Sequence, residues 1–369
     1  MKISSCRHIS SGFTWFKGAI LVMILVLPAE SIGQRKPARQ IINPYEFVDW
    51  QKYGQYKANL NAHTMVGKGW MNPRSVVEEY QKSGYHILAI TDFNSVTYPW
   101  DEFSGMKAGD LSLSRIAHIV PKPFEDTSIP ASDTMFRGIS PSDAGMVAVQ
   151  GCGLLLGKHE VNSYFSNLAG PDEYSPDQTV EENKISVLNH PGMKMASINS
   201  YTGLFRRHHY LKGMEIFNSD SRHRPLLRTW DSLLVAVASE RPVWGFSNDA
   251  FYSVRDLGKN WNVFLLPALN EEEVRLAMNK GAFYLVHAPM GPNGPHPPVI
   301  KSIRVDRKRG MIRIESEGKH SIAWFLNGSK KGRGAKFKVR KLVESCQYVR
   351  AELYGPGNSI VCTQPFFIR

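Results

Sequence analysis

The stretch NLNAHTMVGKGWMNPRSVVEEYQKSGYHILAITDFNS, residues 59–95, holds the clearest structural signals in the chain. Asn72 and Pro73 are a favoured pair for the start of a helix, and Gly84 follows the helical run RSVVEEYQKS. The next run, HILAIT (86–91), is apolar without strict alternation, as in a strand that is covered on both faces. The stretch therefore predicts a helix followed by a buried strand.

Apolar runs of the same kind recur between Tyr56 and about Ala288. They are ISVLNH (185–190), GMEIFN (213–218) and VWGFSN (243–248). Short apolar runs that alternate with helical patterns indicate repeated strand and helix units. The sequence thus predicts an α/β domain over residues 34–290, with a parallel barrel or a doubly wound sheet. A long polar insertion at 99–145 interrupts it.

The pattern changes after GPNGPHPP (291–298), which has the composition of a linker. Runs such as MIRIES and SIAWFL are short, alternate between apolar and polar residues, and are separated by Gly, Asn or Lys. Residues 298–369 are therefore predicted to form a small, basic, all-β sandwich domain.

The first residues of the chain are typical of an export signal. Lys2, Arg7 and Lys17 precede the twelve-residue apolar run GAILVMILVLPA (18–29). That run is shorter than the roughly 20 residues that a membrane-spanning helix needs. We expect residues 1–33 to be a cleaved signal peptide and the protein to be exported, periplasmic or extracellular, with no transmembrane segment after cleavage.

The positive charge is concentrated in the C-terminal segment. Residues 298–369 hold 16 Lys and Arg against 5 Asp and Glu, although the whole chain has a formal net charge of only +12. The segment is either a solvated basic face or a module for an anionic polymer or surface glycan, and nucleic acid is the less expected partner. The side chains expected to contact such a polymer are Lys301, Arg304, Arg307, Lys308, Lys330, Lys331 and Arg333.

Five ionisable residues stand where apolar runs end, namely His63, Asp92, Glu160, His190 and Asp249. Barrels and open α/β sheets place ligands and catalytic groups at the carboxyl ends of their strands, so these side chains should meet at one rim. Their mixture of nitrogen and oxygen donors suits Zn, Mn or Fe. Each residue alone has a simpler explanation, such as a hydrogen-bonded histidine or a turn. Their joint placement favours a metal site.

These motifs, with LLLGKHEVN, VLNHPG and WGFSNDAF, resemble the polymerase and histidinol phosphatase (PHP) family over roughly residues 56–288. The resemblance implies a distorted (β/α)7 barrel and a metal-dependent phosphoesterase. The family usually reads His-x-His, Ser-Asp-Gly, Thr-Asp-His, a Glu, a His-Pro turn, and Asp-x-His or Asp-Ala-His. This chain keeps His63, Glu160, His190 and Asp249.

Four positions depart from the family pattern: Asn61, Lys68, Phe93 and Phe251. In three-metal members, the residues expected at the last three of these positions hold the same ion, so the resemblance implies at most two ions per chain. One possibility is that the ammonium group of Lys68 replaces the lost positive charge and binds phosphate. The alternative is that these changes are decay in a site that is no longer used.

The resemblance also implies the roles of individual residues. The expected metal ligands are His63, Glu160, His190 and Asp249, with Asn61, His223 and Asn218 as further candidates. The expected catalytic residues are Lys68, Asp92 and Glu160.

Two functions follow from these expectations. The leading interpretation is an exported PHP-like phosphoesterase, a hydrolase with a one- or two-metal centre that acts on a phosphate-containing molecule. The alternative is a catalytically inactive pseudoenzyme that binds an anionic ligand or polymer. Metal content separates the two.

Overall fold

The computed structural model describes residues 41–98, 100, 139–166, 184–191, 197–219, 223–339 and 346–368. The predicted signal peptide (1–33) lies outside the described residues, as does most of the predicted insertion at 99–145. No helix in the described part of the chain is long and apolar enough to cross a membrane.

The described residues form four α-helices and two short 3-10 helices. The α-helices are α1 (Pro73–Lys82), α3 (Ile198–Arg207), α4 (His223–Val237) and α5 (Glu271–Lys280), and the 3-10 helices are Val254–Asp256 and Pro356–Asn358. Helix α1 starts where the sequence predicts, because the side chain of Asn72 accepts a hydrogen bond from the Ser75 amide at 2.8 Å.

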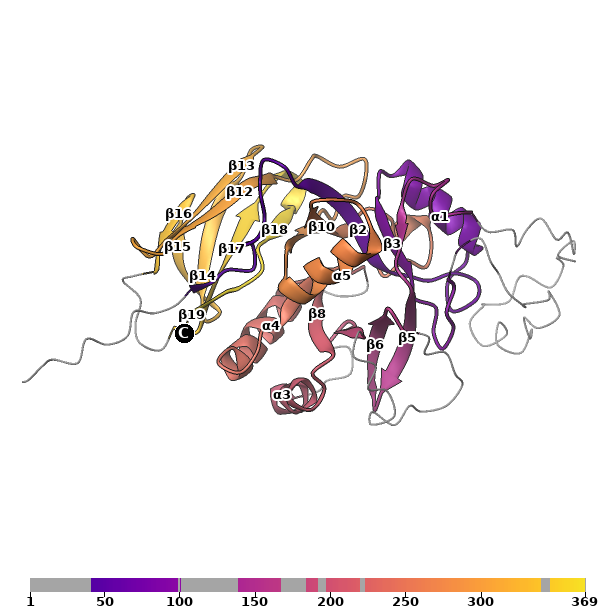
Figure 1. Cartoon of the computed structure of the whole chain (residues 1–369), viewed down its shortest axis with the longest axis horizontal. Helices are drawn as coiled ribbons and strands as arrows, with labels where there is room; N and C mark the ends of the chain where they lie inside the picture. Colours follow the sequence, from indigo (N-terminus) through magenta and orange to yellow (C-terminus); the bar gives the residue numbers. More distant parts are fainter. Residues whose placement is uncertain are drawn as a thin grey trace, which may run out of the picture. The chain divides into compact units, whose positions relative to one another are not determined.

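The largest sheet has 11 strands and combines both halves of the chain (Figure 1). Its strands are β1 (Ile41–Ile42), β2 (Gly54–Ala62), β3 (Ile87–Ile90), β4 (Val147–Ala148), β10 (Asn260–Leu266), β11 (Phe283–His287), β14 (Ser321–Leu326), β15 (Ser329–Arg333), β17 (Tyr348–Tyr354), β18 (Ile360–Cys362) and β19 (Phe366–Ile368). Their main path is β1-β19-β17-β18-β11-β10-β2-β3-β4, and β14 joins β15 to β17.

Two smaller sheets complete the described structure. One contains β5 (Gly151–Leu156), β6 (His159–Tyr164), β7 (Ile185–Leu188), β8 (Leu211–Phe217) and β9 (Trp244–Ser247), in that order. The other contains β12 (Val299–Asp306), β13 (Met311–Glu317) and β16 (Lys336–Lys338). The predicted runs HILAIT, ISVLNH, GMEIFN and VWGFSN correspond to β3, β7, β8 and β9.

Two isolated bridges bring the large sheet and the five-stranded sheet together. Ala62 at the end of β2 pairs with Phe251 beyond β9, and Phe93 beyond β3 pairs with Gly153 in β5. Single bridges are not continuous ladders, so the described strands do not close into a barrel. The mixed α/β class is confirmed, but the predicted (β/α)7 barrel and separate C-terminal sandwich are not.

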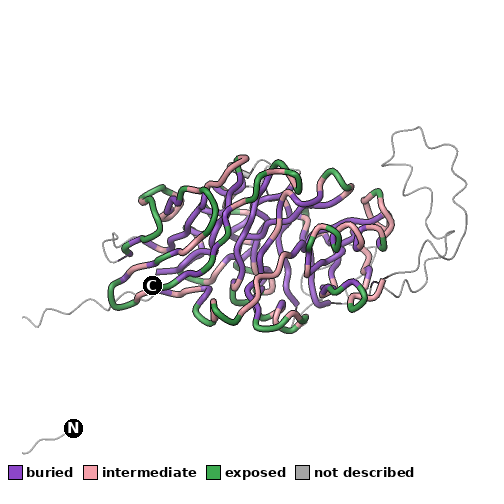
Figure 2. The backbone as a smooth tube through the Cα atoms, turned by 90° about the horizontal axis from the view of Figure 1, so that it is seen from above, coloured by how far each residue is buried: buried purple, intermediate pink, exposed green. Residues whose placement is uncertain are grey.

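Most strand residues are buried, and the exposed residues lie mainly in turns, on helix surfaces and along β12, β13, β15 and β16 (Figure 2). Helix α4 packs against α3 and β8, whereas α5 packs against β10. The main hydrophobic core contains Trp230 of α4 and Phe246 of β9 together with Tyr348 and Phe367 from the C-terminal strands. The C-terminal strands therefore share a core with the α/β part of the chain.

Candidate active site

His63 follows β2 and lies almost fully buried, with 7% of its surface exposed. Its backbone amide donates to the Phe251 carbonyl at 2.8 Å, and its ring stacks on Tyr252 with centroids 4.8 Å apart. The ring nitrogen Nδ1 is buried and has no hydrogen-bond partner in the described structure. A buried nitrogen without a partner is costly, so this atom is suited to bind a ligand.

Glu160 and His190 meet from neighbouring strands. Glu160 lies in β6 and His190 lies beyond the end of β7, and the Glu160 Oε2 to His190 Nε2 distance is 3.2 Å. His190 has a φ of +28°, which is unusual for a residue with a side chain. Such strain is common at functional sites, where surrounding contacts fix the conformation.

The pKa of His63 is influenced by the charges of Glu160, His190 and Lys68, so these groups lie within electrostatic range of its ring. The pKa of His63 is lowered to about 4, first by burial and then by the positive charges of Lys68 and His190, whereas Glu160 acts to raise it. Lys68 is partly exposed, and its Nζ lies 4.7 Å from the centre of the Phe93 ring. His63 thus interacts electrostatically with Lys68, Glu160 and His190.

Asp92 is placed differently, because its oxygens are used by the loop that follows β2. They accept hydrogen bonds from the Thr64 amide at 2.7 Å, the Thr64 hydroxyl at 2.5 Å and the Thr97 hydroxyl at 3.1 Å. A Cβ atom at Gly67 would lie 2.6 Å from Asp92 Oδ1, so glycine is needed there. Asp92 therefore holds the loop that presents Lys68.

Asp249 has a similar structural role in another loop. Its oxygens accept hydrogen bonds from the amides of Gly258, Lys259 and Asn260 at 2.8 to 2.9 Å, and from the Tyr85 hydroxyl at 3.1 Å. Burial raises its pKa to about 6 despite these bonds. In this structure Asp249 closes the connection between β9 and β10.

The other predicted positions also have defined places. Phe251 is fully buried in a cluster with α1 residues, and its ring centre lies 5.3 Å from that of Tyr80. His223 is the first residue of α4, and its side chain lies outside the described residues.

Glu215 is a central residue that the sequence analysis missed. It lies in β8, is fully buried, and each of its two oxygens accepts two hydrogen bonds. Asn61 and Asn248 donate to Oε1 at 2.8 and 3.0 Å, whereas Asn218 and the His190 amide donate to Oε2 at 3.1 and 3.0 Å. Glu215 thereby fixes the backbone of His190. Its signal was an acidic residue within the apolar run GMEIFN.

Asn61 connects this carboxylate to β3. Its amide nitrogen donates to Glu215, and its amide oxygen accepts a hydrogen bond from the Thr91 hydroxyl at 3.1 Å. Both the amide nitrogen and the amide oxygen of Asn61 are thus hydrogen-bonded within the protein. The amide nitrogen of Asn218 is hydrogen-bonded as well. Position 61, two residues before His63, needs a side chain that both donates and accepts a hydrogen bond, and asparagine meets this need.

The spacing of Glu160 and His190 is compatible with two ligands of the same metal ion. Two ligands that lie about 2.1 Å from the same ion at roughly 90 to 110° are about 3.0 to 3.4 Å apart. The 3.2 Å between Glu160 Oε2 and His190 Nε2 falls in that range. The described residues hold no group of three His, Cys, Asp or Glu side chains already arranged around a common point. His63, with its unpartnered Nδ1, interacts electrostatically with both Glu160 and His190 and is a further candidate donor.

Comparisons with known proteins find similar proteins among solved structures alone. No family model matches the sequence, and no curated protein matches it. A two-domain protein from Bacteroides vulgatus that contains a predicted PHP-like metal-dependent phosphoesterase is 12% identical, with a TM-score of 0.48. That similarity covers 90% of this chain and 99% of the other.

Two further solved structures are similar over part of the chain. One, from Bifidobacterium adolescentis, is provisionally described as a metal-dependent phosphoesterase, with 12% identity, coverage of 53% and 87%, and a TM-score of 0.33. The other is an amidohydrolase from Chromobacterium violaceum with bound sulfate and no metal, with 11% identity, coverage of 60% and 96%, and a TM-score of 0.35. The structural neighbours thus include PHP-like metal-dependent phosphoesterases, the class that the sequence motifs resemble.

Proposed function

We propose that this protein is a PHP-like hydrolase of phosphoric esters that works with one divalent metal ion. The contact between Glu160 and His190, at the spacing of two ligands of one ion, carries this proposal. Glu160 and His190 would hold the ion, with His63 as the third donor. A Zn, Mn or Fe ion there would supply Lewis-acid chemistry and polarise a phosphoryl oxygen.

Lys68 is the residue proposed to bind the substrate's phosphate. Its ammonium group is partly exposed, and it forms no ion pair in the described part of the chain. The hydrogen bonds of Asp92 to Thr64 hold the start of its loop, so the ammonium group is presented from a fixed backbone. A positioned cation stabilises the charge on nonbridging phosphoryl oxygens.

The proposal limits the number of ions to one. Asp92 accepts hydrogen bonds mainly from the loop after β2, Asp249 accepts them from its own loop, and Phe251 packs in the core at another expected ligand position. One ion is within the limit of two that the family resemblance implies.

Elemental analysis and hydrolysis assays on the full chain, purified without chelator, test this proposal. We expect about one transition-metal ion per chain and hydrolysis of 4-nitrophenyl phosphate or its diester. Glu160→Gln should lose most of the metal and the activity, because an amide is a weaker ligand than a carboxylate. Glu272→Gln, an exposed carboxylate on α5, is the matched control and should keep both.

Two results would overturn the proposal. Metal retained in full by Glu160→Gln would show that this carboxylate is not a ligand. A parent protein with neither metal nor activity would instead favour a binding protein for an anionic ligand.

A further inference from the structure

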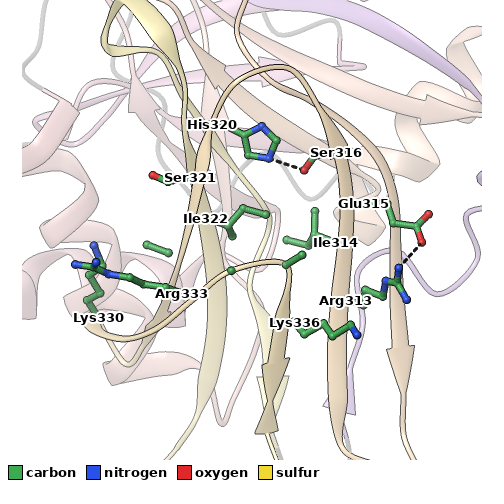
Figure 3. A pocket seen from close by; sticks show the side chains of 13 residues that line it. Arg313, Ile314, Glu315, Ser316, His320, Ser321, Ile322, Lys330, Arg333 and Lys336 are labelled. Carbon is green, nitrogen blue, oxygen red and sulfur yellow. Dashed lines mark hydrogen bonds and ion pairs between the residues drawn. The ribbon is translucent and has the colours of Figure 1, made fainter.

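A basic groove of about 750 Å³ lies between β13 and β14, away from the candidate active site (Figure 3). In Figure 3, Ile314 and Ile322 lie between the labelled basic side chains, and His320 and Ser316 lie at one end. The basic residues that line it are Arg313, His320, Lys330, Arg333 and Lys336. The groove therefore has an apolar floor and charged margins.

A single chain segment builds the groove by passing from one sheet to another. Arg333 is paired with Ala323 in the large sheet, whereas Lys336 is paired with Arg313 in the three-stranded sheet. Gly334 allows this crossing because its φ is +90°, a conformation that glycine adopts without strain. The crossing is fixed by hydrogen bonds from the Gly334 amide to Ile322 and from the Ile314 amide to Ala335, both 2.9 Å long.

The basic side chains of the C-terminal segment differ in their ion pairing, and three of those that line this groove have no ion pair among the described residues. Elsewhere, Lys301 pairs with Glu317 at 3.2 Å and Arg307 pairs with Glu46 at 2.7 Å. In contrast, Lys330, Arg333 and Lys336 are exposed and form no ion pair within the described residues. Positive charges gathered in a concave site attract anions more strongly than scattered surface charges do.

One carboxylate moderates the charge of the groove. Glu315 lines it and lies 3.4 Å from Arg313 and 4.0 Å from Arg304. Removing the charge of Glu315 should therefore strengthen anion binding. A variant that gains affinity is thus one test of this site.

The remaining lining indicates which anion fits. Ser316 and His320 are hydrogen-bonded to each other at 2.7 Å, and Ser321 adds a further hydroxyl. These groups can bind sugar hydroxyls and anionic oxygens. The described lining contains no Phe, Tyr or Trp side chain, the large rings on which the bases of a single-stranded nucleic acid stack best. The chemistry favours a polyanion without bases.

We propose that this groove binds a linear acidic polysaccharide that carries sulfate or carboxylate groups on successive sugars. Arg313 and Arg333 would bind these groups through their planar guanidinium forks, and Lys330 and Lys336 would act as point charges. The binding would not depend on the proposed hydrolase activity.

Calorimetric titration of the full chain at low salt tests this site. The probes are a heparin-derived hexasaccharide, a galacturonate hexasaccharide and a single-stranded DNA. The DNA has the same net charge as the heparin-derived hexasaccharide. The groove variant is Lys330→Gln, Arg333→Gln and Lys336→Gln. The control is Lys301→Gln, Lys308→Gln and Arg309→Gln, which removes the same charge and side-chain types from positions outside the groove.

We expect the groove variant to bind an acidic hexasaccharide at least about tenfold more weakly, while the control loses less than about threefold. Glu315→Gln should bind about two- to threefold more tightly than the parent. The stronger of the two saccharides identifies the anionic group. Equal losses in both triple variants would show binding to net charge alone and overturn the proposal. Tighter binding of the DNA than of both saccharides would also overturn it.

Discussion

Glu215 lies at the centre of the site, and each of its two oxygens accepts two hydrogen bonds from N–H donors. Burying such a group is costly unless its acceptors are satisfied, and three asparagine amides with one backbone amide satisfy them here. Asn61 is the donor that also connects to β3, through the Thr91 hydroxyl. The single histidine of the stretch 59–70 is therefore accompanied by an amide with a structural role.

Asn61→Asp should destabilise the protein. The new carboxylate would face Glu215 Oε1 across a contact that is now a 2.8 Å hydrogen bond. Two buried like charges cannot both ionise cheaply, so we expect a loss of roughly 2–4 kcal/mol in the free energy of unfolding above about pH 7. The loss should shrink as the pH is lowered, because the pair then shares a proton. Urea unfolding at several pH values measures it.

Two variants complete this test. Asn293→Asp adds the same charge at an exposed position and should be nearly neutral. Adding Glu215→Gln to Asn61→Asp should recover part of the stability, since an amide would again face a carboxylate. If Asn61→Asp is as stable as the parent at every pH, Asn61 and Glu215 are not in contact.

At the scale of elements, local signals predict backbone positions well. The Asn72 cap, Pro73 and the apolar run at 86–91 predict α1 and β3, and the structure confirms both. These signals are local because capping and periodicity involve residues a few positions apart. In the structure His63 follows β2, Glu160 lies in β6 and His190 follows β7.

The partners of each side chain are less predictable, because they depend on loop conformations. Asp92 and Asp249 follow strands as expected, yet the oxygens of Asp92 accept from an amide of the loop after β2, and those of Asp249 accept from amides of its own loop. The end of a strand fixes roughly where a side chain lies, but the conformation of the surrounding loops determines which hydrogen-bond donor its carboxylate meets. The same limit explains the missed role of Glu215, whose donors come from four separate segments.

The loop closed by Asp249 should respond to pH with a defined sign. Burial raises the pKa of Asp249 from its ordinary value of 3.8 to about 6, with Lys57, Tyr80 and Tyr85 as ionisable neighbours. A raised pKa in the folded state means that the protonated form stabilises folding. That contribution is complete below about pH 4 and is lost as the pH rises through about 6.

Asp249→Asn lacks this titration. The parent should therefore lose up to roughly 3 kcal/mol of unfolding free energy relative to the variant as the pH rises from about 4 to 7. Asp143→Asn, at an exposed position, should show no such change. Metal content should also be unchanged in Asp249→Asn. A pH-independent difference would refute the raised pKa, and lost metal would restore Asp249 as a ligand.

For the whole molecule, the C-terminal strands are tied to the α/β part by a buried ion-pair network. Arg350 of β17 is 1% exposed and binds both oxygens of Asp231 in α4, at 2.8 and 2.7 Å. It also donates to Glu352 at 2.5 Å, and the Tyr348 hydroxyl donates to Asp231 at 2.7 Å. Strand β18 extends the same connection, because it pairs with β11 in the large sheet. We therefore expect the C-terminal strands and the α/β part to unfold as one cooperative unit.

Arg350→Met should destabilise the folded protein by roughly 3–5 kcal/mol, because it leaves the carboxylates of Asp231 and Glu352 buried without their cation. Arg304→Met, which removes an exposed guanidinium, is the control and should change stability little. Combining Arg350→Met with Asp231→Leu and Glu352→Leu should recover much of the loss, since no unpaired charge then remains in the network.

Urea unfolding of the full chain, followed by both tryptophan fluorescence and far-ultraviolet circular dichroism, decides whether the network connects two domains or belongs to one. We expect the two signals to change together in the parent and to shift together in Arg350→Met, because a shared sheet and core unfold as a unit. Two separate transitions, with only one of them shifted by Arg350→Met, would show that residues 298–369 fold independently, as their sequence alone suggests.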